Sequence, residues 1–397
     1  MRRIIIKEAR PGMVAARTLS GAGPDAQPVV IAATGQALTM DHLIKSHELG
    51  LYDLWVVDPG LEFCDELCAQ PTAAQVRLAD GLRDSFLRLS TCLSRALFKR
   101  YSLVLQEIVQ SILRAAPSVP CFNAFTEDEP LLTHSCDVAA LSILLGLQLE
   151  GYLVEQRRRL NCRQARDVVN LALGALFHDV GELMLPMQQR ESRQAYFEND
   201  DWKQHATEGY AIVRGHLDPS AAGVVLHHHQ RCDGTGFAGA VTVARPPRSS
   251  DSGPRVLAGE NIHVYARIVM AADVFCQTSF AGARLPQPMV KTLWQLQQLP
   301  LRRAMDPTVL QCLLTMFQPF VEGSVVGLND QRQAIVIKVD PQLPCYPQVQ
   351  VLSPSEAGEE THLNLCETAE YRVEVIDGMV IEPFLYGVRK AAPLQAA

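Results

Sequence analysis

Seven histidines and aspartates between residues 134 and 273 have the chemistry and the positions of a buried metal centre. Each lies in or at the end of an apolar, helix-like pattern, and they are His134, His178, Asp179, His205, His228, His229 and Asp273. Imidazole and carboxylate ligands together favour divalent metals of intermediate hardness, such as iron, manganese or zinc. A buried carboxylate without a partner is very costly, and a bound cation relieves that cost. We therefore expect a metal-centred hydrolase site built inside a helical domain.

The helices that must position these ligands can be traced from the apolar spacing. His134 precedes Val138, Leu141 and Leu145 by four, seven and eleven residues, which places it on the inward face of a helix. Asp273 follows a similar apolar stripe. Any one such residue is more simply explained as a hydrogen-bonded core histidine or as an aspartate paired with arginine. The seven together favour the metal site.

Composition limits the class of protein and of partner. The 397 residues exceed one ordinary domain, and the apolar fraction of 48% is ample for a buried core. A net charge of -7 argues against a nucleic-acid polymer as partner. The N-terminus lacks the pattern of a secretory signal, and no apolar stretch reaches the roughly 20 residues that a membrane span needs. The eleven cysteines then indicate reduced thiols and a cytoplasmic protein.

The chain divides into four parts by its pattern of strand, helix and breaker residues. Residues 1–70 predict a small α+β module, 71–121 a helical linker, 122–320 a helical domain with all the candidate ligands, and 321–397 a small β-rich extension. The expected fold class is therefore mainly α. A helix is expected at 40–49, with strands at 3–6, 29–31, 54–57, 324–328, 334–339, 348–352 and 371–376.

The linker carries an apolar stripe at helical spacing. The stripe consists of Val76, Leu82, Phe86, Leu89, Leu93 and Leu97. Such a stripe most often packs on its own domain. It can also pair with a second copy of the chain, so a homodimer is one expectation.

The candidate ligands occur in motifs with a distinctive order. These motifs are His134-Ser135, His178-Asp179-Val180-Gly181, His205 four residues before Gly209, His228-His229 with Asp233-Gly234-Thr235-Gly236, and Ala272-Asp273-Val274. The ordered set resembles the HD-GYP family, a branch of the HD phosphohydrolases, over residues 134–318. Segments 9–13, 34–39 and 323–326 also resemble the small modules often attached to that family.

The resemblance implies hydrolysis of cyclic di-GMP, a bacterial second messenger, to pGpG or GMP. It implies two divalent transition metals, iron or manganese, bridged by Asp179 as a catalytic residue. The other ligands divide into two groups, His134, His178 and Asp273 for one metal and His205, His228 and His229 for the other. Substrate-binding roles fall on Asp233, Gly234, Gly236, Phe237 and Arg284.

The sequence departs from the family pattern on the substrate side. Glu182 stands where the family has a lysine that supports the phosphate. An acidic group facing an anionic substrate has the wrong sign, so Glu182 either weakens substrate binding or joins the catalytic site as an extra metal ligand. The family's Gly-Tyr-Pro reads Gly236-Phe237-Ala238, and Arg284 is what remains of an arginine-rich segment.

Two further functions stay open beside the phosphodiesterase. One is a catalytically weak sensor or adaptor of the same fold, which binds a nucleotide or a partner such as a diguanylate cyclase. The other is a phosphohydrolase of a different nucleotide. The intact ligands favour an enzyme, whereas Glu182 and the lost Tyr-Pro favour the adaptor. We expect the isolated His42, His47 and His362 at the surface, outside the site.

Overall fold

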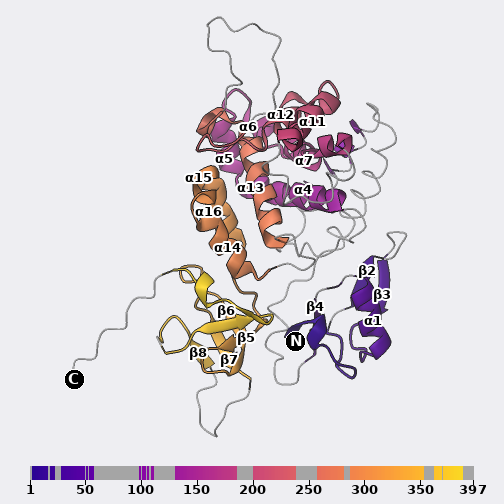
Figure 1. Cartoon of the computed structure of the whole chain (residues 1–397), viewed down its shortest axis with the longest axis vertical. Helices are drawn as coiled ribbons and strands as arrows, with labels where there is room; N and C mark the ends of the chain where they lie inside the picture. The colour runs from indigo at the N-terminus through magenta and orange to yellow at the C-terminus, as the bar shows by residue number, and fades with distance from the viewer. Residues whose placement is uncertain are drawn as a thin grey trace, which may run out of the picture.

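A computed structural model shows a helical domain with two small β-containing modules side by side beneath it (Figure 1). The described residues are 2–16, 18–22, 28–49, 51, 53–57, 98–99, 101–103, 105–106, 109–110, 130–185, 200–237, 257–280, 287–352, 362–368 and 370–387. The expected mainly helical chain with small β modules is confirmed. Within the described ranges no single helix is long and apolar enough to cross a membrane, and the bent pair α4–α5 meets the test only jointly.

The helical domain runs from α4 to α16. Its elements are α4 (Pro130–Gln148), α5 (Glu150–Gln156), α6 (Cys162–Ala165), α7 (Val169–Leu176), the 3-10 helix η3 (Val180–Met184), α10 (Asp200–Lys203), α11 (His205–Val213), α12 (Pro219–His227), the 3-10 helix η4 (Gly259–Asn261), α13 (Val264–Phe280), α14 (Met289–Gln297), α15 (Leu301–Ala304) and α16 (Pro307–Met316).

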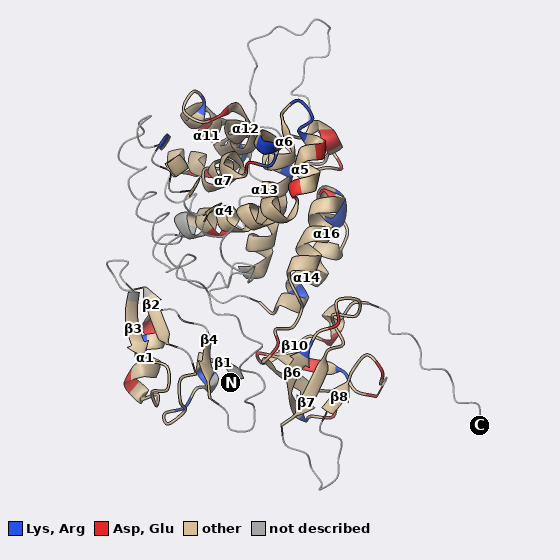
Figure 2. Cartoon of the chain, turned by 180° about the vertical axis from the view of Figure 1, so that it is seen from behind, with Lys and Arg blue, Asp and Glu red and all other residues tan. Residues whose placement is uncertain are grey.

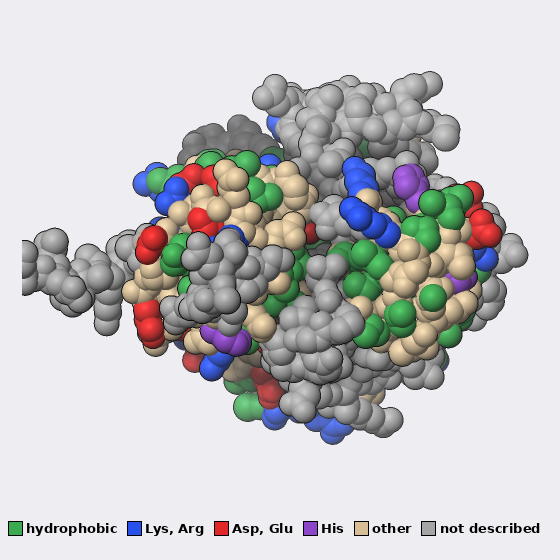
Figure 3. Space-filling view, turned by 90° about the horizontal axis from the view of Figure 1, so that it is seen from below, with side chains coloured by type: hydrophobic (Ala, Val, Ile, Leu, Met, Phe, Trp, Pro, Cys, Tyr) green, Lys and Arg blue, Asp and Glu red, His purple; other side chains and the backbone are tan. Residues whose placement is uncertain are grey.

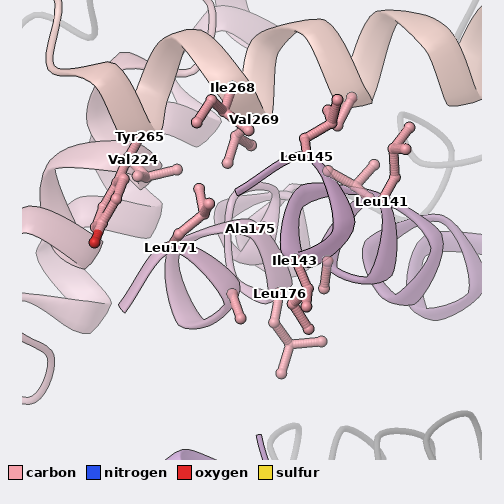
Figure 4. Close-up of a cluster of buried hydrophobic side chains, with 14 of the residues drawn as sticks. Leu141, Ile143, Leu145, Leu171, Ala175, Leu176, Val224, Tyr265, Ile268 and Val269 are labelled. Atoms are coloured by element: carbon pink, nitrogen blue, oxygen red, sulfur yellow. The ribbon is translucent and has the colours of Figure 1, made fainter. Parts of the chain in front are cut away.

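The apolar core of this domain lies where α4, α7, α12 and α13 meet. Leu141 and Leu145 of α4, Leu171 of α7 and Val269 of α13 are fully buried there (Figure 4). No charged residue occurs in α7 and only Asp137 in α4, so acidic and basic colours are sparse along both helices (Figure 2). The candidate ligands are therefore carried by helices whose other side chains are almost all apolar.

The linker segment contributes to the same core where it is described. Phe98, Tyr101, Leu105 and Val109 are buried in the cluster that includes Phe177. The rings of Phe98 and Tyr101 meet Phe177 edge-on, with centroids 5.3 and 5.2 Å apart. The described part of the linker thus packs on its own domain. Residues 71–97, which carry the stripe itself, lie outside the described residues, and the four-part division and the homodimer stay predictions.

The N-terminal module contains two antiparallel strand pairs and one helix. Its elements are β1 (Arg2–Ile5), η1 (Ile6–Glu8), β2 (Leu19–Ala22), β3 (Pro28–Ala32), α1 (Met40–Glu48) and β4 (Asp53–Val56), with β1 paired to β4 and β2 to β3. Val30, Met40, Ile44 and Val57 of this module are exposed, and apolar side chains are visible on it from below (Figure 3). Strand β2 has too little β-branched character to have been predicted.

The C-terminal module is one antiparallel sheet in the order β10-β9-β5-β6-β7-β8. Its strands are β5 (Val325–Leu328), β6 (Gln333–Lys338), β7 (Gln348–Val351), β8 (His362–Asn364), β9 (Val373–Ile376) and β10 (Met379–Val380), followed by the 3-10 helix η5 (Glu382–Phe384). Asp377 and Gly378 form the hairpin turn between β9 and β10, and both have the positive φ, 49° and 76°, that such a turn needs. The short β8 and β10 gave no usable sequence signal.

Side chains of α14 connect the helical domain to the C-terminal sheet. Val290 of α14 is buried in the core of the sheet module, and the ring of Trp294 meets Phe384 edge-on at 5.3 Å between centroids. On the other side β1 contacts β5. Both small modules therefore lie at the end of the helical domain where α14 is found.

The three isolated histidines lie in these small modules. His47 and His362 are exposed, and His42 is half-buried.

A buried ion pair fixes the position of α16 against α5 and α13. Oδ1 of Asp306 caps α16 by accepting from the backbone N–H of Thr308 at 2.8 Å. Its Oδ2 accepts from Arg267 Nη1 and, at 2.6 Å, from the Tyr152 hydroxyl. Arg267 also donates to the Gln156 side chain at 2.6 Å. Both side chains are about 3% exposed. The loss of either partner therefore leaves the other charge buried and unpaired in a low-dielectric interior.

Replacing Asp306 by alanine should lower the free energy of unfolding by about 3–5 kcal/mol, because the Arg267 charge stays buried and the helix cap is lost. Urea denaturation of the full chain measures the change. Glu150→Ala is the matched control, since the Glu150–Arg166 pair is about half exposed on both sides and such pairs contribute about 0–1 kcal/mol. Equal losses in the two variants would contradict the argument.

Candidate metal centre

All seven candidate ligands come together in the core of the helical domain, in two adjoining groups. In the first group one ligand atom from each residue lies within 4.8 Å of the others, and the group is Asp179, His205, His228 and His229. The second group meets the same limit and consists of His134, His178 and Asp273. The structure thus makes the same division that the family resemblance implied.

Asp179 lies between the two groups and presents one carboxylate oxygen to each. Its Oδ1 is 3.4 Å from His205 Nε2 and 3.3 Å from His228 Nε2. Its Oδ2 is 3.2 Å from His178 Nε2 and 3.9 Å from His134 Nε2. A carboxylate with its two oxygens directed into two ligand groups has the geometry of a bridge between two cations.

The second group is closed by Asp273 of α13. Its Oδ1 is 2.8 Å from His134 Nε2 and 3.8 Å from His178 Nε2. The side-chain amide of Gln277, one turn further along α13, donates to the same oxygen at 2.7 Å. Gln277 was not predicted, although its i+4 spacing from Asp273 places it on the same face of the helix.

Three of the histidines are held by the backbone carbonyl three residues earlier. The Nδ1 atoms of His178, His205 and His228 lie 2.7, 2.6 and 2.9 Å from the carbonyl oxygens of Ala175, Trp202 and Val225. A carbonyl only accepts, so each Nδ1 must donate. In the neutral ring, Nε2 then carries the lone pair, which is the tautomer a metal ligand needs.

The Nε2 atoms of the three histidines in the first group lie close together, and a cation between them would stabilise this arrangement. Nε2 of His205 is 3.3 Å from Nε2 of His228 and 3.1 Å from Nε2 of His229. Because His205 and His228 both donate through Nδ1, their Nε2 lone pairs face the same small volume and repel one another. A divalent cation held there turns this repulsion into ligation, so the donor set fits a transition metal with N and O ligands.

Burial and charge shift the pKa values of these groups strongly. Burial lowers the pKa of His205 to about 4, and burial with the neighbouring His228 holds the pKa of His229 well below its ordinary value. Burial also opposes the charge on His178, but the adjacent carboxylate of Asp179 outweighs it and raises the pKa of His178 to about 9. The pKa of Asp179 is correspondingly held well below its usual range. Neutral rings at His205 and His229 and an ionised Asp179 are the ligand states a metal requires.

Two glycines allow η3 to lie against α11. A Cβ atom on Gly181 would be 1.9 Å from the His205 carbonyl oxygen and 2.6 Å from the Gly209 nitrogen. Because both neighbours are backbone atoms, they cannot turn away. The spacing of His205 and Gly209 seen in the sequence therefore has a physical cause, since both glycines lie at the contact that sets Asp179 beside His205.

Glu182 lies in the wall of the site, in a contact that sequence reasoning missed. It is 3% exposed, and its Oε1 accepts a hydrogen bond from the indole Nε1 of Trp202 at 3.1 Å. The Trp202 ring lies 4.4 Å from the His205 ring and 5.0 Å from the His229 ring between centroids. Trp202 precedes His205 by three residues, which is the one sequence signal that could have placed it beside the ligands.

The predicted substrate-binding residues form the loop after α12. The Phe237 ring stacks on the His229 ring, with centroids 4.7 Å apart and planes at 26°. Asp233 is exposed and accepts from the Thr235 backbone at 3.0 Å, and Gly234 has a φ of 77°. A Cβ on Gly236 would be 2.3 Å from the His229 carbonyl oxygen. Arg284 lies outside the described residues.

Comparison with known proteins finds similarity over the helical domain. Residues 131–277 match the family model described as HD domain, a range that includes all seven ligands. The chain carries an HD domain. It is also 26% identical over 297 residues to the cyclic di-GMP phosphodiesterase PA4108 of Pseudomonas aeruginosa, an alignment that covers 72% of this chain and 61% of that relative.

Comparison with solved structures gives a partial likeness. Bd1817, described as an HDG"Y"P protein from Bdellovibrio bacteriovorus, aligns with a TM-score of 0.45 and 15% identity, over 78% of this chain and 97% of that one. The HD domain inferred from the ordered motifs is confirmed by the family match.

Removing the central carboxylate should empty the HD-domain site. We expect about two transition-metal equivalents per chain in the wild type, and Asp179→Ala should lose at least one because both groups share this carboxylate. Metal analysis after anaerobic purification measures the content. His47→Ala and His362→Ala, which replace exposed histidines of the small modules, should keep the wild-type value. Wild-type protein that neither holds nor takes up metal would refute the site.

Gly181→Ala should disrupt the same site through packing alone. The added methyl group meets backbone atoms of α11, so we expect a loss of about 3 kcal/mol in stability together with reduced metal content. Gly223→Ala is the matched control, because a Cβ there meets nothing within 4 Å and alanine is the better helix former by about 1 kcal/mol. A Gly181 variant that keeps both metals and full stability would show that the close approach is not needed.

Proposed function

We propose that this HD-domain protein is a metal-dependent phosphodiesterase that hydrolyses cyclic di-GMP to pGpG or GMP. The observation that carries the proposal is the position of Asp179, whose two oxygens face two separate ligand groups 3.2 to 3.4 Å away. Paired sites of this kind suit in-line displacement at phosphorus. The relative from Pseudomonas is a cyclic di-GMP phosphodiesterase, which supports cyclic di-GMP as the substrate.

The residues hold the reacting groups rather than attack the substrate. Two bound divalent metals would supply a water of lowered pKa and positive charge for the phosphate oxygens. His205, His228 and His178 keep their Nε2 atoms directed inward through their carbonyl bonds, so little reorganisation is needed on binding. The buried, ionised Asp179 balances part of the positive charge.

The donor set favours iron or manganese. All seven ligands offer nitrogen or oxygen, which suits metals of intermediate hardness. Cys276 belongs to neither ligand group, and burial with the charges of Asp137 and Asp273 raises the pKa of its thiol well above the ordinary value. We infer two ions, one for each group of ligands.

The alternative within the same fold is a weak enzyme that serves as a sensor or adaptor. Glu182 in place of the family's lysine, and Phe237-Ala238 in place of Tyr-Pro, favour it. Its partner would be a nucleotide or a diguanylate cyclase. A phosphohydrolase of another nucleotide is the remaining alternative. A cytoplasmic location and a bacterial signalling role belong to the same proposal.

A panel of cyclic dinucleotides separates these functions. Anaerobically purified protein with measured metal should convert cyclic di-GMP to pGpG or GMP, and a chelator should abolish the conversion because the proposed nucleophile is a water activated by the bound metals. Chromatography of the products measures it, with Asp179→Asn as the inactive control. If metal-loaded wild type hydrolyses no member of the panel, the adaptor replaces the phosphodiesterase.

Glu182→Gln tests whether Glu182 binds a metal or only lines the site through its hydrogen bond to Trp202. Glutamine keeps an oxygen for the Trp202 indole but removes the charge, so we expect metal content to stay at the wild-type level and kcat/KM to change by less than about threefold. Glu182→Ala removes the acceptor and should lower activity about tenfold, or 1.4 kcal/mol, through Trp202. A Gln variant that loses a metal equivalent would make Glu182 a ligand.

A further inference from the structure

A lysine is held over the aromatic ring that covers the first ligand group. The Nζ atom of Lys203 lies 5.9 Å from the centroid of the Phe237 ring. That ring stacks on the imidazole of His229 at 4.7 Å. The ammonium group is therefore on the rim of the group formed by Asp179, His205, His228 and His229, and not on a remote surface.

The backbone around Lys203 is tied to the same group. Lys203 ends α10 directly after Trp202, whose carbonyl oxygen orients His205 at 2.6 Å. The Trp202 indole is held in turn by Glu182 at 3.1 Å. The start of the lysine side chain is thus fixed relative to the ligands, while its half-buried stem leaves the charged end at the rim.

The charge at this rim has a use if the substrate is a phosphodiester. The acidic Glu182, which stands where the family has lysine, is 3% exposed and bonded to Trp202. Phe237 offers no hydroxyl donor. An anionic phosphate that approaches the first ligand group over Phe237 therefore meets the ammonium of Lys203, whose three donors suit phosphate oxygens.

We propose that Lys203 binds a nonbridging phosphate oxygen of the substrate and supplies from α10 the positive charge that position 182 lacks. The proposal rests on the function proposed above, and it makes Lys203 a substrate-positioning residue. Lys203 is not one of the seven candidate ligands, so a phosphate bound to it displaces none of them.

The chain offers a matched control for the lysine–aromatic contact itself. Lys291 of α14 lies 5.4 Å over the ring of Phe384, beside the C-terminal module. Lys291→Gln removes the same type of contact away from the ligands. Lys203→Gln removes the charge at the rim, and Lys203→Arg restores it on a different head group.

The test measures binding of inorganic phosphate to the metal-loaded full chain by titration calorimetry. Lys203→Gln should keep both metals and the wild-type melting temperature, and should bind phosphate about tenfold more weakly, as expected for one lost charge-assisted hydrogen bond. Its affinity should also depend less on salt than that of the wild type. Lys203→Arg should stay within about threefold, and Lys291→Gln should match the wild type.

The same variants are then assayed on bis(4-nitrophenyl) phosphate, where Lys203→Gln should raise KM more than it lowers kcat. Equal phosphate affinity in wild type and Lys203→Gln, loss of metal from that variant, or no phosphate binding by the metal-loaded wild type would each overturn the proposal. If the wild-type protein binds phosphate through Lys203 but cleaves no phosphodiester, the proposed phosphodiesterase activity is wrong, whereas the proposed anion-binding role of Lys203 is supported.

Discussion

The structure of the helical domain depends on one buried carboxylate shared by several imidazoles. Asp179 is 3% exposed and has three histidine nitrogens within 3.4 Å. Such a group is unfavourable in an apolar core unless cations or donors surround it. The surrounding helices satisfy this requirement by ending at the centre, so that α7, α11 and α12 bring their polar residues in at a terminus while their apolar faces pack.

Because these helices end at the metal centre, backbone atoms orient several of the ligand side chains. The last turn of a helix leaves carbonyl groups without intrahelical partners, and His178 and His228 use such carbonyls, from Ala175 and Val225, to fix their rings. The glycines at 181 and 209 serve the same purpose, because they let backbone approach backbone. The metal side of the site is thus built into the fold, and a change of one surrounding side chain leaves it in place.

The seven residues that the structure brings together on the metal side could all be named from the sequence, and their role as ligands stays a prediction. Periodic apolar residues after His134 and before Asp273 placed both on the inward faces of their helices. The contacts of Trp202 and Lys203 left no such pattern, since they depend on how α10 meets the loop after α12. Spacing likewise said nothing of the acceptor role of Glu182, which was weighed only as a charge facing substrate. Short strands such as β2 and β8 were missed because three or four residues carry too little periodicity.

The substrate side obeys a different constraint, and this decides how the departures from the family pattern should be interpreted. The side chains of Phe237, Trp202, Glu182 and Lys203 contact one another there, and Phe237 and Trp202 also lie against the ring of His229. The carboxylate of Glu182 is engaged by the indole of Trp202, and the same α10 that carries Trp202 carries the cation of Lys203. An altered motif on this side is therefore compatible with a working metal centre, because charge can be supplied from another element that reaches the same rim.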